Sequence, residues 1–540
     1  MPAYDYMDET PISGGVGMAV PPEAPEPMVP PPDIAAPPPI PVETTPVQSV
    51  PAETVSAQPK MDQPFVVPPA SGNSNNPFIP QVVPDEASQS PGDQQGAVAA
   101  TPGNPMPKRI LMISVFLVLL VLLIFGGKFV LGLVGGSSPV TLTYWGLWEN
   151  DATVKSVLAG FEATHPKIKV VYAKQSPKQY RERLQAFIAK GDGPDVFRFH
   201  NTWVPMLRNE LAPAPKTAIT AADFASTFYP VASADLVGGQ SVYGVPMMID
   251  GLGLFYNEDL FAAAGVTPPA TWEELLNIVP KLTVKNDTTI VTSAIALGTT
   301  GNVEHFSDIL ATMMMQNGAK LSVPTGKQAE EALIFYSKFA NPSDPVYSWN
   351  STMDNSIYAF ASGKVAMILA PSWRVFDIKQ TSPTLRFKVA PIPQLPGNTV
   401  TWATYWVEGV SAKSKNQKQA WELIQYMTSK EAVTKMYSES SKIRLFGEPY
   451  ARVDLASTIS DDPYAGAYIK QASTAKSFPL ASRTFDNGIN DKLIKYFEDA
   501  ANGLAQGTAP TAALDTASSG FRQVLGSFGL TTGAAPTTTP

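Results

Sequence analysis

Tryptophan is concentrated at the positions where this sequence is expected to leave its β-strands. Six of the nine tryptophans lie at such strand ends or in the loops after them: Trp145, Trp148, Trp203, Trp373, Trp402 and Trp406. An indole ring is flat and apolar, so it can cover the C–H face of a sugar ring. The pattern favours a carbohydrate ligand, and we expect Trp145, Trp148, Trp203, Trp373 and Trp406 to contact it. Any of these rings could instead pack the interior of a domain.

Polar side chains near the same positions are candidate partners for sugar hydroxyls. We expect Asn201, Asp250, Glu408 and Arg444 to contact the ligand. A buried group directed at a hydroxyl discriminates strongly, because a ligand that lacks the hydroxyl leaves that group unpaired. Each candidate has a structural alternative: Asp250 could cap or bridge a hinge, Asn201 could belong to a surface loop, and Arg444 could form an ion pair.

The residue types exclude several kinds of catalytic and metal chemistry. The chain has no cysteine, which rules out disulfides, thiol nucleophiles and cysteine-ligated metals. The histidines are too far apart in sequence to form a metal-ligand pattern: His165, His200 and His305. The motifs of serine hydrolases, phosphate-binding loops and zinc proteases are also missing. We therefore expect no metal and no cofactor.

Glycoside cleavage is the one enzymatic alternative that the carboxylates leave open. Asp250 together with Glu304 or Glu408 could in principle act as acid and base. Nothing in the sequence sets the separation of these groups, and carboxylates are also ordinary ligands of sugars. We expect a binding protein and not an enzyme.

Charge and proline are distributed unevenly along the 540 residues. Residues 1–107 hold 26 of the 52 prolines and carry a net charge of −11, whereas residues 108–540 carry +3. A segment so poor in aromatic residues cannot bury enough apolar surface to fold. We expect 1–107 to be a disordered, proline-rich acidic tail, either a spacer or a polyproline docking site. The small charge of the remainder argues against nucleic acid as a partner.

A long apolar run follows this tail. Lys108 and Arg109 precede Ile110–Val134, which is 25 residues long and, at about 1.5 Å per residue, reaches across a bilayer core of ~30 Å. We expect residues 108–136 to form one transmembrane helix that contacts the lipid bilayer through 110–134. The basic pair predicts a single-pass protein of the cell membrane, with a cytoplasmic N-terminus and the rest exported. A cleaved signal peptide is the alternative.

From Pro139 onward, short apolar runs alternate with amphipathic segments. The first five predicted elements are a strand over 140–145, a helix over 151–162, a strand over 168–172, a helix over 180–189 and a strand over 195–199. Such alternation predicts an α/β layer with a mostly parallel sheet. Further helices are predicted at 271–282, 304–316, 327–339, 351–362, 415–428, 431–438, 488–502 and 512–525. Residues 529–540 are small and polar, and we expect them to be disordered.

Five short motifs follow one another in a fixed order. They are Gly191–Val196, Tyr243–Pro246 with Asp250 and Gly253–Leu260, Pro268–Leu275, Gly363–Met367, and Pro371–Trp373. In this order they resemble the extracellular solute-binding proteins of ABC importers, in the sugar-type branch related to maltose-binding protein. The resemblance covers about residues 139–528. It implies a sugar-facing tryptophan at Trp373 and a sugar-binding carboxylate at Asp250.

The resemblance also implies the architecture, an α/β, two-lobed periplasmic-binding-protein-like fold of type II. Within a solute-binding domain at 139–528, lobe one would take about 139–247 and 397–443, and lobe two about 254–390 and 446–528. The chain would cross between them near Met248–Gly253, Pro391–Pro396 and Arg444. Several crossovers would let the lobes hinge closed on a ligand.

The function implied is that of a membrane-anchored extracytoplasmic receptor, which binds a sugar or oligosaccharide and delivers it to the permease subunits of an ABC importer. This chain departs from the family pattern in its anchor, because a transmembrane helix stands in place of a lipidated cysteine. A tethered sugar sensor without transport is the alternative. A glycoside-acting enzyme is a further alternative function.

Overall fold

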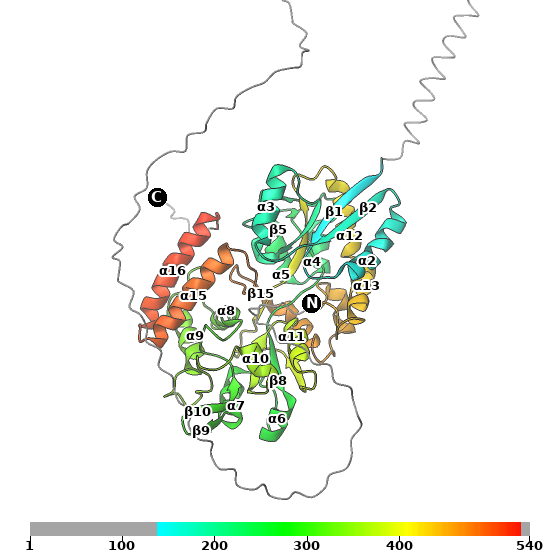
Figure 1. The fold of residues 1–540 in the computed structure, drawn as a ribbon. Coiled ribbons are helices and arrows are strands. Elements are labelled where there is room, and N and C mark those ends of the chain that lie inside the picture. Colours follow the sequence, from blue (N-terminus) through cyan, green and yellow to red (C-terminus); the bar gives the residue numbers. More distant parts are fainter. Residues whose placement is uncertain (1–137, 531–540) are drawn as a thin grey trace, which may run out of the picture. The chain divides into compact units, whose positions relative to one another are not determined.

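The computed structural model of the chain describes residues 138–530 (Figure 1). The predicted tail over 1–107, the predicted membrane helix over 110–134 and residues 531–540 lie outside the described part. Within residues 138–530, every helix is too short or too polar to cross a bilayer.

The first sheet has the strand order β2-β1-β3-β14-β4, and β7 pairs with β14 at its side. Its strands are β1 (Val140–Gly146), β2 (Ile168–Lys174), β3 (Val196–His200), β4 (Leu211–Ala212), β7 (Val245–Pro246) and β14 (Trp406–Ser411). Strand β1 runs parallel to β2 and β3, as predicted. Strand β14, which the chain adds to this sheet after building the second one, is antiparallel to β3.

Helices α2 (Asp151–Thr164), α12 (Gln417–Met427) and α13 (Lys430–Ser441) pack together beside this sheet. Helix α2 buries Val154, Val157, Leu158 and Phe161, the residues whose spacing predicted it. Asn150 caps the helix, since its side chain accepts a hydrogen bond from Thr153 N at 2.9 Å. We call this sheet and these helices, with α3 (Tyr180–Lys190), α4 (Ala221–Thr227) and α5 (Pro230–Leu236), the first lobe.

The second sheet has the order β12-β8-β11-β10-β9. Its strands are β8 (Gly253–Asn257), β9 (Val284–Asn286), β10 (Thr289–Ile295), β11 (Val365–Ala370) and β12 (Phe387–Ala390). Strand β8 runs antiparallel to both neighbours, whereas β10 and β11 are parallel, so this sheet is mixed. All six residues of β11 are buried, which explains its unbroken apolar sequence.

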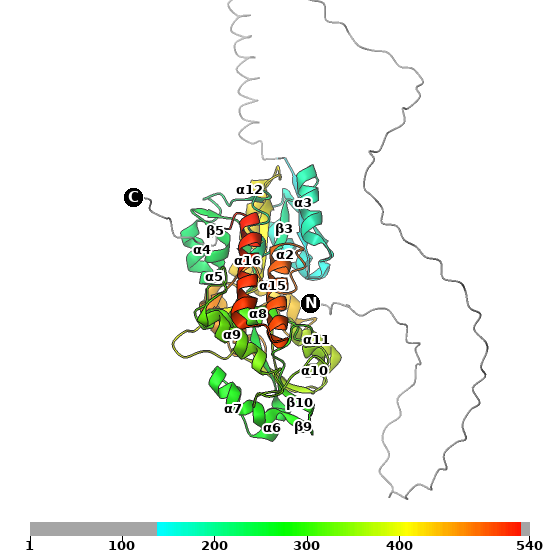
Figure 2. The same ribbon diagram turned by 90° about the vertical axis from the view of Figure 1, so that its left-hand side faces the viewer.

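The second lobe is this sheet with its helices. They are α6 (Glu258–Ala264), α7 (Trp272–Leu282), α8 (Phe306–Gln316), α9 (Lys327–Lys338), α10 (Ser356–Ala361), α11 (Arg374–Thr381), α14 (Gly466–Gln471), α15 (Ile489–Ala505) and α16 (Pro510–Ser527). Helices α15 and α16 lie side by side in both views (Figures 1 and 2). Helices α4, α5, α6, α11 and α14 were not predicted, because six to eight residues are too few to show a helical period.

Short elements complete the described chain. Strands β5 (Val237–Gly238) and β6 (Ser241–Val242) form a hairpin, and β13 (Thr401–Trp402) pairs with β15 (Ala475–Lys476). Three short 3-10 helices are η1 (Asn201–Trp203), η2 (Val453–Thr458) and η3 (Ala472–Thr474).

Connections between the lobes pass close to one another. The segment between β7 and β8 pairs with the segment before β14, since Thr404 N donates to Asp250 O at 2.9 Å. A third segment, after α13, joins them where Ile249 N donates to Pro449 O at 2.9 Å. Gly251 lies opposite Ala403, and a Cβ at Gly251 would overlap the Trp402 carbonyl oxygen. Hinge bending at these segments stays a prediction.

This contact predicts that Gly251→Ala destabilises the protein. The added methyl group would meet backbone, which cannot rotate away, and overpacking of this kind costs about 1–3 kcal/mol. Chemical denaturation measures the free energy of unfolding. The control is Gly526→Ala in α16, where a Cβ meets no atom within 4 Å and the exchange should be neutral or stabilising. Equal stability of the two variants would show that the connections are not in close contact.

Candidate ligand-binding cleft

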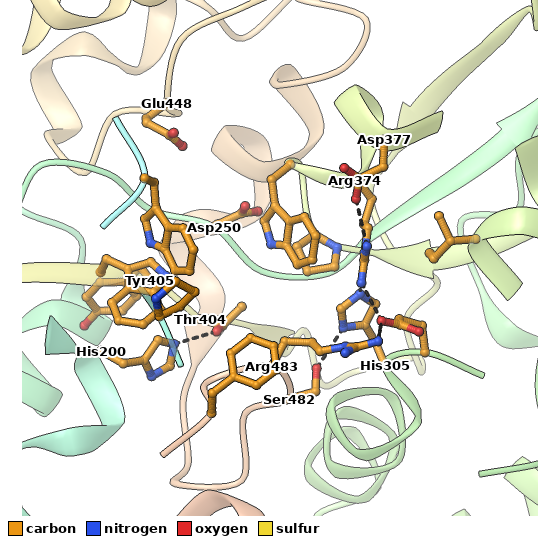
Figure 3. Close-up of a pocket in the computed structure, with 18 of the residues that line it drawn as sticks. His200, Asp250, His305, Arg374, Asp377, Thr404, Tyr405, Glu448, Ser482 and Arg483 are labelled. Atoms are coloured by element: carbon orange, nitrogen blue, oxygen red, sulfur yellow. Dashed lines mark hydrogen bonds and ion pairs between the residues drawn. The ribbon is translucent and has the colours of Figure 1, made fainter. Parts of the chain in front are cut away.

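A cavity of about 930 Å³ is lined by residues of both lobes and of the connections between them (Figure 3). The first lobe contributes Trp148 from the loop after β1 and Trp406 from the start of β14. The second lobe contributes Trp373 from the loop after β11, and the β7–β8 connection contributes Asp250. Four of the nine predicted site residues therefore meet at one cavity, and aromatic rings enter it from both lobes.

The other five predicted residues do not line this cavity, and two of them are tryptophans that pack elsewhere in the first lobe. Trp145 packs against the Phe187 ring of α3 with centroids 5.4 Å apart, because it points to the opposite face from its neighbours in β1. Trp203 is 1% exposed and packs behind Trp406, with centroids 5.4 Å apart. It belongs to the interior of the first lobe.

The remaining three predicted residues are each paired with another polar side chain and do not line the main cavity. Glu408 is completely buried beneath Trp406, where it pairs with Arg198. Asn201 donates to the Asp235 carboxylate at 2.8 Å and lines a second, smaller cavity of about 430 Å³. Arg444 forms an ion pair with Glu448 at 2.8 Å, and it is Glu448 that lines the main cavity.

A buried cluster of charged side chains in the first lobe lies behind Trp148 and Trp406 and supports them. Arg198 donates through Nε to Glu408 Oε1 at 2.7 Å and through Nη1 to Glu149 Oε2 at 2.5 Å. Burial raises the pKa of the Glu408 carboxyl. At Glu149 burial also raises the pKa, but the Arg198 guanidinium outweighs it and the net change is downward. Glu149 follows Trp148, and Glu408 lies two residues after Trp406.

Trp148 and Trp406 form a single aromatic surface. Their rings meet edge to face with centroids 5.1 Å apart, and Trp406 makes a similar contact with His200 at 5.1 Å. Burial lowers the pKa of His200 to about 3, so this imidazole is neutral at physiological pH. Its Nε2 lies 2.8 Å from the Thr404 hydroxyl, which also lines the cavity.

The second lobe supplies a polar wall around Trp373. The Arg374 guanidinium lies over the Trp373 ring at 3.9 Å and pairs with Glu304 at 2.5 Å and Asp377 at 2.7 Å. Glu304 also accepts from Asn355 Nδ2 at 2.5 Å and pairs with Arg483. Both arginines of this wall, Arg374 and Arg483, are thus paired with carboxylates.

Asp250 connects the hinge segment to the loop that carries Trp373. Its Oδ1 accepts from Gly251 N at 2.8 Å and Ser372 N at 3.0 Å, and its Oδ2 accepts from the Ser372 hydroxyl at 2.8 Å. Burial raises the pKa of this carboxyl to about 7, although the same hydrogen bonds act to lower it. The carboxyl therefore changes charge near neutral pH while it faces the cavity (Figure 3).

Several cavity residues were missed by sequence reasoning. Arg374 directly follows the predicted Trp373, so its position could have suggested a role. Glu304, considered above only as a possible catalytic carboxylate, and His305 were placed inside a predicted helix, whereas α8 begins only at Phe306. Arg483 and Phe485 carried no signal, because they lie in a loop without a motif. In the described part of the chain, no three acidic or histidine side chains are grouped to hold a metal ion.

The raised pKa of Asp250 predicts how stability depends on pH in the ligand-free protein. A carboxyl whose pKa rises from about 3.9 in the unfolded chain to about 7 favours folding most below pH 4, and this contribution is lost as pH rises through 7. Wild type should therefore lose stability relative to Asp250→Asn between pH 4 and 7. Denaturation across this range tests it, with Asp192→Asn in an exposed turn as the control. A difference that does not change with pH would contradict the assignment.

Comparisons with known proteins agree with this arrangement. The model of the family described as bacterial extracellular solute-binding protein matches residues 145–434, more than half of the chain. The multiple sugar-binding protein of Streptococcus mutans is 26% identical over 301 residues, which are 54% of this chain and 71% of that protein.

Solved structures share the fold at low identity. The sugar-binding protein MalE of Xanthomonas citri has a TM-score of 0.60 at 21% identity, over 72% of this chain and 98% of that one. The GacH receptor of Streptomyces glaucescens, solved unliganded and with acarbose, has a TM-score of 0.56 at 22% identity over the same shares. The described residues therefore have the α/β fold of two-lobed, maltose-binding-protein-like structures. The chain belongs to the bacterial extracellular solute-binding protein family.

Proposed function

We propose that this protein binds an uncharged oligosaccharide in the cavity between its lobes and delivers it to the permease of an ABC importer. The observation that carries the proposal is the placement of indole rings on both walls, Trp148 and Trp406 on one side and Trp373 on the other. Apolar rings opposite one another suit a ligand with two apolar faces, and the polar groups between them suit its hydroxyls.

Most of the charges around the cavity are paired with opposite charges, which supports an uncharged ligand. Arg374 is matched by Glu304 and Asp377, Arg483 by Glu304, and the Glu448 carboxylate by Arg444. An anionic or cationic ligand would have to compete with these pairs. The cavity volume is near the upper end of the range for binding sites, about 300–1,000 Å³, which supports more than one sugar ring.

The carboxylates do not support the glycosidase alternative. Glu408 is closed off by Arg198 and Tyr144, whose hydroxyl donates to it at 2.8 Å. Glu304 already receives hydrogen bonds from Arg374, Arg483 and Asn355. The family and the fold are likewise those of binding proteins.

Delivery to a permease and anchoring in the membrane are part of the proposal. The family is extracellular, and the apolar run over 110–134 supplies an anchor of sufficient length. A tether of this kind would keep the binding domain at a high effective concentration near a membrane partner.

The first test is a thermal-shift screen of neutral di- to hexasaccharides against uronic-acid oligomers of the same length. A ligand at 100 times its dissociation constant adds ~2.7 kcal/mol of stability, so a true ligand should raise the melting temperature clearly. Stabilisation by uronic-acid oligomers alone would contradict the uncharged class. No stabilisation by any saccharide would contradict sugar binding.

We further expect Trp373→Ala to weaken binding without unfolding the protein. Loss of ~50–100 Å² of apolar coverage at ~25 cal/mol per Å² costs ~1–2.5 kcal/mol, which is roughly a 10- to 70-fold loss of affinity. Calorimetric titration measures the affinity, and melting of the ligand-free variant reports stability. Trp145→Ala is the matched control, because that ring is also half-buried but lies outside the cavity. Equal losses of affinity in both variants would remove Trp373 from the site.

A further inference from the structure

The loop Ser482–Asn487, just before α15, has an unusual backbone. Arg483, Phe485 and Asn487 adopt positive φ angles of 60°, 53° and 46°. They are three of the five non-glycine residues with positive φ among residues 138–530. Bulky side chains such as those of Arg483 and Phe485 are strained in this region, whereas asparagine tolerates it. Strained residues persist only where their surroundings hold them.

This backbone sends alternate side chains in opposite directions. Thr484 and Asp486 are buried, with 3% and 0% exposure, whereas Arg483 and Phe485 line the main cavity (Figure 3). The Arg483 side chain is 40% exposed and pairs with Glu304. The two strained residues, Arg483 and Phe485, thus reach the ligand site, whereas Asn487 is exposed outside it.

Contacts within the second lobe hold the loop in this conformation. The Asp486 carboxylate accepts from the backbone N–H groups of Gly488 at 2.9 Å and Asn490 at 3.0 Å, and from Asn490 Nδ2 at 2.8 Å. At the other end, Ser482 N donates to the buried Asp308 carboxylate at 3.1 Å, and the Ser482 hydroxyl lies 2.8 Å from His305 Nδ1.

The first lobe holds the same loop from the opposite side. Arg181 Nε of α3 donates to the Asp486 carbonyl oxygen at 2.6 Å, and Asn490 Nδ2 donates to the Thr202 hydroxyl at 2.8 Å. Gly488 allows the close approach, since a Cβ there would overlap Met206 Sδ. The loop is therefore fixed from both lobes, and its strain is not relieved by local movement.

We propose that Arg483 and Phe485 determine which oligosaccharide the cavity accepts, and that the strained loop exists to present them to the ligand. The inference rests on the proposed function. Phe485 offers an apolar face to a sugar ring, and the Arg483 guanidinium carries a planar set of donors suited to neighbouring hydroxyl oxygens. Sugars that differ in the orientation of one hydroxyl would be told apart at this end of the cavity.

Three variants of the full-length protein test this inference: Asn487→Gly, Phe485→Gly and Arg483→Gln. Asparagine and glycine both accept positive φ, so Asn487→Gly is the control and should leave the melting temperature of the ligand-free protein within about 2 °C of wild type. Its affinity for trisaccharides should stay within about twofold of wild type. Phe485→Gly should lower affinity at least about fivefold without lowering the melting temperature, because relief of strain offsets the lost ring.

Selectivity is measured with maltotriose, cellotriose and mannotriose as probes. Arg483→Gln should change the ratio of affinities among them by at least about threefold, whereas Asn487→Gly should leave the ratios as in wild type. Suppose that wild type binds a probe, and that Arg483→Gln and Phe485→Gly both bind the three trisaccharides with wild-type affinities and affinity ratios. That result would contradict the role of Arg483 and Phe485 in ligand selection. A melting temperature of ligand-free Phe485→Gly more than about 3 °C below wild type would show that the loop is not strained at this residue. Failure of wild type to bind any saccharide in the wider screen would instead contradict the proposed function.

Discussion

The ion pairs that Arg198 makes with Glu149 and Glu408 are the interaction on which the rest of the cleft depends. The guanidinium is completely buried and joins the loop after β1 to neighbouring strands β3 and β14. Burying such charges costs several kcal/mol per ion, and removal of one partner would leave the others uncompensated. The Tyr144 hydroxyl, which donates to Glu408, satisfies part of the cluster. This buried charge cluster therefore makes the first-lobe wall of the ligand site rigid.

This arrangement explains why the aromatic surface of the first lobe has a defined shape. The loop that carries Trp148 is held by Arg198 through Glu149, and also by Tyr172, whose hydroxyl donates to Glu149 O at 3.1 Å. Trp406 is held through the pairing of β14 with β3, where it lies opposite His200. Across the cavity, Asp250 plays the corresponding part for the Trp373 loop by accepting from Ser372. Each wall of the cleft is thus built on a buried carboxyl.

The sequence predicted those parts of the fold that depend on local pattern. The strand at 140–145 and the helix at 151–162 follow from periods of two and 3.6 residues, and both are present. The position of Glu408 could not be predicted from local pattern. Along β14 it follows Trp406 by two residues on the same face, but only the register with Arg198 reveals that it lies beneath the cavity wall. Arg483 and Phe485 could not be predicted either, because their backbone conformation is imposed by contacts with residues of both lobes that are distant in sequence.

Hydrogen exchange, followed by mass spectrometry as an oligosaccharide is added, tests most directly whether the cavity between the lobes is the binding site. We expect slower exchange in three separate segments of the cavity wall, 146–150, 371–374 and 482–487. Exchange in α6 and in the β9–β10 hairpin, which do not line the cavity, should not change. Two results would contradict binding in the cavity between the lobes. One is slower exchange limited to the smaller cavity around Asn201 and Asp235, and the other is unchanged exchange in all three segments when sugar is bound.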